Sequence, residues 1–95
     1  MAKYLVQSYK TTVSSIVDAR KRAYKMLNKI PTTYKQTCAI WEMWGQMKVE
    51  VARVTWHPYI VGALAYYEIS NGKVTKMGMM DGQGRVDFTP QPRYI

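Results

Sequence analysis

The chain has 95 residues and a formal net charge of +8, and 47% of its residues are hydrophobic and 21% charged. This length leaves no room for a second domain, and the near-average composition excludes a generally disordered chain. We expect one domain over residues 1–89. Residues 90–95 should follow as an extended tail, because Pro90 and Pro92 have no amide hydrogen to donate to a sheet.

Cys38 is the only cysteine, so the chain cannot form an internal disulfide. The longest apolar run, Ile60 to Tyr67, has eight residues, whereas a membrane-spanning helix needs about 20. The first ten residues contain no apolar stretch of the length found in signal peptides. We therefore predict a cytoplasmic protein that makes no contact with membranes.

The positive charge is concentrated in the first part of the chain. Residues 1–36 contain eight basic residues and one acidic residue, a net charge of +7, whereas residues 37–95 contain six and five, a net charge of +1. Such an asymmetry predicts a directed electric field that speeds encounter with polyanions or acidic protein surfaces.

One long helix is predicted near the N-terminus. Residues 3–9 alternate as a short strand does, and a turn with a hydroxyl N-cap follows at residues 10–12. Apolar residues at helical spacing then predict an amphipathic helix from Thr11 to Ile30, about 30 Å long, that ends at Pro31. Its apolar stripe consists of Val13, Ile16, Val17, Ala23, Tyr24, Leu27 and Ile30.

Opposite the stripe lies a basic ridge, which we define as Lys21, Arg22, Lys25 and Lys29. Lysines four residues apart repel each other by about 0.2–0.5 kcal/mol per pair, and Asp18 is the only acid nearby. The ridge therefore predicts an acidic partner that offsets this repulsion. The alternative is an ordinary solvated face, in which Lys25 and Lys29 also suit the negative end of the helix dipole.

The chain beyond the helix is rich in β-branched, aromatic and methionine residues, which favour strands. We expect strands at residues 37–44, 47–56, 59–70 and 73–80, and an edge strand at 85–89. The turns are predicted at Gly45-Gln46, His57-Pro58 and Asn71-Gly72, of which the Asn-Gly pair is typical of tight hairpins. The alternative for residues 33–48 is a second helix.

This order of elements predicts an α+β fold. One helix would pack across a curved antiparallel four-strand meander, preceded by the N-terminal strand. The order is similar to that of cystatin-like folds. This is a comparison of architecture alone and implies no function.

The Asn71-Gly72 loop also predicts which residues share a face of the last hairpin. The other face has small residues near its centre, such as Ala65 and Gly78, so we expect the helix to cover it. An uncovered apolar face would then indicate a homodimer or a partner protein, unless the sheet curves over it or the terminal segments cover it. That uncovered face, here called the methionine face, comprises Leu64, Tyr66, Met77 and Met79.

Arg20 is the one charged residue within the apolar stripe of the helix, where a buried charge needs a partner. One interpretation is an ion pair with Glu42 or Glu68, or a side chain that reaches solvent along the sheet edge. The other is a functional guanidinium that holds an anionic ligand group in a pocket.

No motif for catalysis, metal binding or nucleotide binding is found. His57 and Cys38 are the only histidine and cysteine, and they offer neither a metal-ligand spacing nor an activated nucleophile. We interpret Gly82-Gln83-Gly84 as a turn, since no helix follows it whose N-terminus would hold a phosphate. The sequence predicts no enzyme activity, no metal and no cofactor.

The basic ridge is therefore the feature on which the functional prediction depends. It predicts a non-enzymatic binding protein for nucleic acid or a nucleoprotein, with Trp41 and Trp56 as candidates for stacking on bases. The alternative is a small inhibitor or adaptor of the kind that phages and mobile elements encode, which blocks host anti-phage defence or nucleic-acid-processing machinery. A third hypothesis is a small-ligand-binding protein with a pocket centred on Arg20.

Overall fold

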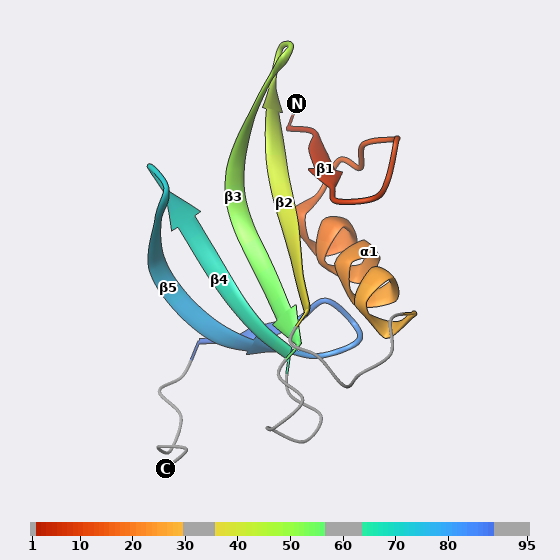
Figure 1. Cartoon of the computed structure of the whole chain (residues 1–95), viewed down its shortest axis with the longest axis vertical. Coiled ribbons are helices and arrows are strands. Elements are labelled where there is room, and N and C mark those ends of the chain that lie inside the picture. Colours follow the sequence, from red (N-terminus) through yellow and green to blue (C-terminus); the bar gives the residue numbers. More distant parts are fainter. Residues whose placement is uncertain (1, 30–35, 57–63, 89–95) are drawn as a thin grey trace.

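The computed structural model describes residues 2–29, 36–56 and 64–88. In these residues one helix packs against a single curled antiparallel sheet (Figure 1). The elements are β1 (Tyr4–Val6), α1 (Ile16–Asn28), β2 (Gln36–Trp44), β3 (Met47–Trp56), β4 (Leu64–Ser70), β5 (Lys73–Met80) and β6 (Val86–Asp87). The predicted α+β class is confirmed. The described sheet has six strands instead of a four-strand meander, because β1 pairs with β2 and β6 pairs with β5.

The helix begins at Ile16, later than the predicted start at Thr11. Ser15 is the N-cap, and its hydroxyl accepts a hydrogen bond from the amide of Asp18 at 3.1 Å. A serine followed three residues later by an acid is a common capping pattern, so the local sequence defines this start.

The residues before the helix join the sheet instead. The amide of Val13 donates to the carbonyl of Tyr4 at 2.9 Å, and the amide of Tyr4 donates back at 2.8 Å. An earlier helix start would lose both bonds. Because α1 ends at Asn28, it is about 20 Å long instead of 30 Å, and the predicted stop at Pro31 lies outside the described residues.

Most of the strand predictions are confirmed. β3 and β5 have the predicted bounds of 47–56 and 73–80, and β2 begins one residue before the predicted position 37. The alternative of a second helix is wrong for residues 36–48, which lie in β2, β3 and the turn between them. The sequence predicts these strands well because their turns are well defined. The predicted tail at 90–95 lies outside the described residues.

Two of the three predicted turns fall within the described residues. Asn71 and Gly72 both have positive φ, at 52° and 77°, as a tight hairpin requires, and Gly45 has a φ of 65°. The predicted turn at His57-Pro58 and the first residues of the predicted strand 59–70 lie outside the described residues.

A β-bulge in the β4–β5 hairpin changes which side chains share a face. The hairpin has the predicted register next to its turn, but the register shifts between Glu68 and Ile69. Beyond this point Tyr66 lies opposite Gly78 instead of Met77. Compared with the prediction, one extra residue in β5 therefore exchanges the two faces of that strand relative to the faces of β4.

The predicted methionine face is consequently wrong as a single surface. Leu64 and Tyr66 are buried in the core that α1 covers, and Met80 is buried with them. Met77, by contrast, is 55% exposed, and Met79 is half-buried. On β4 the helix therefore covers the face that was expected to remain open, whereas on β5 Gly78 and Met80 lie on the covered face, as expected.

The core lies between α1 and the sheet. Small residues of the helix, Ala19 and Ala23, are fully buried and let the helix approach the strands closely. Among the described residues, Tyr66 is the largest fully buried side chain, with 1% of its surface exposed. The buried core consists of Val6, Ala19, Ala23, Leu27, Cys38, Ile40, Ala52, Val54, Leu64, Tyr66 and Met80.

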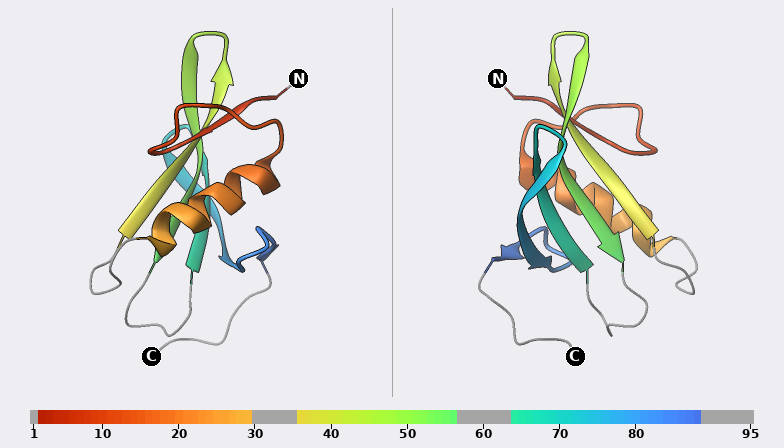
Figure 2. Two further views of the ribbon diagram at one scale, coloured as in Figure 1. Left: turned by 90° about the vertical axis from the view of Figure 1, so that its right-hand side faces the viewer. Right: turned by 60° about the vertical axis from the view of Figure 1, so that its left-hand side comes forward.

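The curl of the sheet brings segments distant in sequence against the helix, which crosses one face of the sheet (Figure 2). The turn predicted at Gly82-Gln83-Gly84 is confirmed. Gly84 is buried against the backbone of Val17, and Gly82 packs on the ring of Tyr24. This turn and the segment that contains β1 both contact α1 and fix the helix on the sheet.

The two long hairpins diverge toward their tips (Figure 1). β3 pairs with β4 only from Ala52 to Trp56, opposite Glu68 to Leu64. The outer half of β3, residues 47–51, therefore pairs with β2 but not with β4.

Candidate functional site

Three residues of the basic ridge form an exposed row along α1. Lys21, Lys25 and Lys29 are exposed, and we call them the lysine row. Between described residues, ion pairs join Arg53 to Glu50 and Arg85 to Asp81, and none includes the row. The positive charge of the row is thus uncompensated within the described part of the chain.

Arg22, the fourth residue of the basic ridge, has a structural role instead. Its guanidinium donates to the carbonyl of Thr11 at 2.6 Å and to the Thr11 hydroxyl at 3.2 Å, and it lies 5.0 Å from the ring centroid of Tyr9. These contacts hold the segment between β1 and α1 against the helix. Because Arg22 is engaged in this way, we count three ridge residues, not four, as available to a partner.

Arg20 forms neither of the predicted ion pairs with Glu42 or Glu68. Its guanidinium carbon lies 4.4 Å from the centroid of the Tyr66 ring, and Nη1 donates to the carbonyl of Gly84 at 3.4 Å. Its Nε is buried and has no hydrogen-bond partner. The face of an aromatic ring attracts a cation electrostatically and so replaces part of the stabilisation that water would give. The Tyr66 ring therefore explains how the fold accommodates the charge of Arg20.

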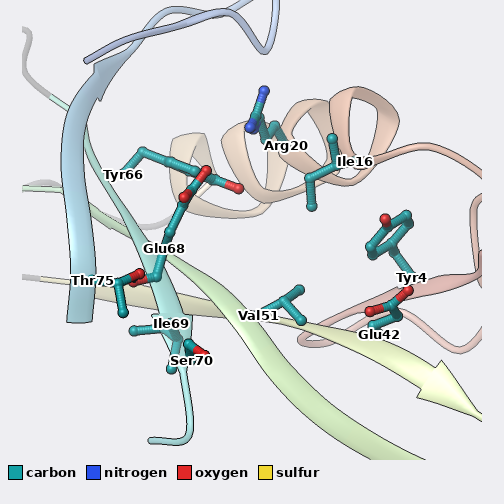
Figure 3. A pocket seen from close by; sticks show the side chains of 10 residues that line it. All are labelled: Tyr4, Ile16, Arg20, Glu42, Val51, Tyr66, Glu68, Ile69, Ser70 and Thr75. Carbon is teal, nitrogen blue, oxygen red and sulfur yellow. The ribbon is translucent and has the colours of Figure 1, made fainter. Parts of the chain in front are cut away.

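A cavity of about 330 Å³ opens beside Arg20, between the first turns of α1 and the diverging hairpins (Figure 3). It has a mixed lining of charged, hydroxyl-bearing and apolar side chains. Figure 3 shows Glu68 pointing toward Tyr66 and Arg20, while Tyr4 and Glu42 lie at the opposite end. The lining consists of Tyr4, Ile16, Arg20, Glu42, Val51, Tyr66, Glu68, Ile69, Ser70 and Thr75.

Tyr66 connects this cavity to the core. Its ring meets that of Phe88 edge to face at 6.2 Å between centroids. Burial raises the pKa of the Tyr66 hydroxyl, and the neighbouring Arg20 partly offsets this rise. Glu68 and Tyr4, in contrast to Arg20, raise the pKa of the Tyr66 hydroxyl further. The cavity therefore combines charges of both signs around a neutral phenol.

The β2–β3 hairpin ends in an apolar tip that was not predicted. Trp44 is 59% exposed and Met47 is 66% exposed, on either side of the Gly45-Gln46 turn. Large apolar residues beside a turn are the sequence signal from which this surface could have been inferred. We call Trp44 and Met47 the hairpin tip.

The two tryptophans considered for base stacking lie elsewhere. Trp41 is half-buried, and the ammonium group of Lys48 lies 4.3 Å from its ring centroid. Trp56 packs against the core cluster. Neither ring is as open to a partner as Trp44.

Cys38 is fully buried in β2, and burial raises the pKa of its thiol from 9.0 to about 12. No group of three His, Cys, Asp or Glu side chains in the described part of the chain could hold a metal ion. The thiol is enclosed by core side chains and is not placed as a nucleophile.

We expect Cys38 to react at least about 1000-fold more slowly with iodoacetamide in the folded protein than in urea at about pH 8, because a pKa near 12 leaves little thiolate. The folded state favours the neutral thiol. This contribution to stability is therefore present below the ordinary pKa of 9.0 and is lost as the pH rises toward 12. Mass spectrometry of timed samples measures both rates, and equal rates would contradict the burial of the thiol.

Comparison with known proteins found no matching family model, no similar curated protein and no similar solved structure. None of the helices in the described residues is both long and apolar enough to cross a bilayer. The functional argument therefore depends on the surfaces of the chain itself.

Proposed function

We propose that this protein is a non-enzymatic binding protein that engages nucleic acid or a nucleoprotein through the lysine row on α1. The observation that carries the proposal is that Lys21, Lys25 and Lys29 are exposed side by side and form no ion pair with a described residue. Phosphate groups are the partners that such a row fits best. Each lysine that contacts a phosphate releases a counterion that was condensed on the nucleic acid, and this release favours binding.

The way in which the helix is held supports this proposal. Arg22 fastens α1 to the preceding segment, and Gly84 packs against Val17 from the other end of the sheet. The lysine row therefore has fixed spacing and orientation before a partner arrives. Such preorganisation lowers the entropic cost of binding, because the backbone that presents the charges is already ordered.

The test is fluorescence anisotropy with labelled RNA and DNA oligonucleotides over a range of salt concentrations. Three phosphate contacts predict a log-log slope of affinity against salt between about −2 and −3. Replacing Lys21, Lys25 and Lys29 by Glu should reduce affinity at low salt by about 100-fold or more, because attraction becomes repulsion at each contact. A slope near zero would contradict the proposal.

A matched variant separates the position of the charges from their number. Lys3, Lys73 and Lys76 are exposed lysines outside the row. Changing these three to Glu lowers the net charge from +8 by two units per residue to +2, as the row variant does. We expect this control to keep most of the affinity. Equal losses in the two variants would show that only the net charge matters.

A second candidate is the inhibitor or adaptor that blocks host machinery, and the hairpin tip favours it. Tryptophan and methionine are enriched where proteins bind one another. Trp44 and Met47 are exposed beside the turn of the β2–β3 hairpin, and the tip of this hairpin extends beyond the rest of the sheet (Figure 1). In the same assay this candidate predicts no binding to oligonucleotides. It also predicts a stoichiometric protein complex that is lost with Trp44→Ala and kept with the row variant.

A further inference from the structure

The cavity beside Arg20 contains charges that the described part of the chain does not pair. Glu42 and Glu68 line it, and neither carboxylate forms an ion pair with a described residue. Lys76, the residue across the strand from Glu68, places its ammonium group 4.3 Å from the Phe88 ring centroid instead. Arg20, the third charged residue of the lining, also forms no ion pair with a described residue. The cavity thus presents two carboxylates and one guanidinium donor.

This combination selects the charge of the occupant. A phosphate or another multiply charged anion would meet repulsion from Glu42 and Glu68. A ligand that carries only positive charge would be repelled by the Arg20 guanidinium, which forms no ion pair with a described residue. A ligand with two positive groups and one carboxylate matches all three lining charges.

The positions of the side chains in Figure 3 suggest how such a ligand would be oriented. Arg20 and Glu68 lie toward one end of the cavity, and Glu42 lies at the other end beside Tyr4. The apolar side chains of Ile16 and Val51 are also part of the lining. The chemistry of the lining is therefore polar, apolar and then polar along the cavity.

We propose that this cavity binds a free basic amino acid of the lysine or arginine type. The α-carboxylate pairs with Arg20 and the α-ammonium group with Glu68. The aliphatic part of the side chain lies over Ile16 and Val51, and its terminal cation pairs with Glu42. A volume of about 330 Å³ is in the range of small-ligand sites, of about 300–1,000 Å³. This site is separate from the lysine row, so either proposal stands or fails without the other.

The experiment is a titration of the folded, isotopically labelled protein with L-arginine, followed by NMR of the backbone amides. We expect saturable shifts at Tyr4, Val51 and Tyr66. Agmatine, which is arginine without the carboxylate, should bind at least about 10-fold more weakly, as should norvaline, which lacks the side-chain cation. Equal binding of agmatine and arginine, or no saturable shift at these residues, would overturn the proposal.

Conservative variants identify the pairing groups. Glu42→Gln should weaken arginine at least about 10-fold and leave the weak binding of norvaline unchanged, since norvaline has no group to pair with Glu42. Glu68→Gln should weaken both ligands. Glu50→Gln is the control, because Glu50 pairs with Arg53 and is not part of the cavity lining. If Glu50→Gln weakens arginine as much as Glu42→Gln does, the binding is not at this cavity.

Discussion

Replacing Tyr66 by alanine should cost about 3–5 kcal/mol of folding free energy, as is usual for removal of a large buried ring. Tyr66 is the largest side chain that is fully buried in the described part of the chain, and it contacts Phe88 and Arg20. Its loss would leave a void in the core and remove the aromatic face on which the Arg20 guanidinium lies. Because domains of this size have total stabilities of about 5–15 kcal/mol, this loss would remove a large part of the free energy of unfolding. Urea denaturation followed by tryptophan fluorescence measures the change.

Tyr66→Phe is the matched control for this prediction. It keeps the ring against Phe88 and beneath Arg20 and removes only the hydroxyl. We expect a cost below about 1.5 kcal/mol, the usual range for one hydrogen bond. If the phenylalanine variant loses as much stability as the alanine variant, the hydroxyl and not the ring holds this part of the core together.

Gly78→Ala should destabilise the protein by about 2–3 kcal/mol through overpacking alone. A Cβ atom at this position would lie 2.7 Å from the carbonyl oxygen of Asp87 and 2.9 Å from the ring of Phe88. The carbonyl belongs to the backbone of β6, so relief requires β6 to move away from β5. We expect faster hydrogen exchange at Val86 and a lower urea midpoint.

Gly72→Ala provides the comparison, because Gly72 has open space around its Cβ position but a φ of 77°. Its cost comes from backbone conformation alone and should be about 1–2 kcal/mol. Gly78→Ala should lose more stability than Gly72→Ala, and only Gly78→Ala should speed hydrogen exchange in β6. The reverse order would mean that β6 is not packed closely against β5.

The sequence predicts the parts of the fold that local chemistry determines. The bounds of β3 and β5 follow from their turns, since Asn71-Gly72 adopts the positive φ angles that a tight hairpin needs. Thr11 and Thr12 also offer hydroxyl N-caps, so the local sequence allows a helix start earlier than the one that Ser15 caps. The pairing of Val13 with Tyr4 is a tertiary contact, and it alone decides between a helix start at positions 11–12 and one after Ser15.

The faces of the last hairpin could not be predicted in the same way. The register shift next to Glu68 has no local signal of the kind that Asn-Gly gives for a turn, and one extra residue exchanges the faces of β5. The groups that surround Arg20 could not be predicted from the helical pattern of the sequence either. The sequence pattern predicts a carboxylate partner for Arg20, whereas the tertiary fold brings an aromatic face and the backbone carbonyl of Gly84 to it.

The packing of the turn after β5 on α1 has a consequence for how the chain folds. The β2–β3 and β4–β5 hairpins close between near neighbours in sequence and form early, since short loops cost little entropy. The contact between Arg20 and Gly84 spans 64 positions, so we expect it to form after the hairpins. We expect the helix to gain its final protection from hydrogen exchange only in the last kinetic phase, after both hairpins have formed.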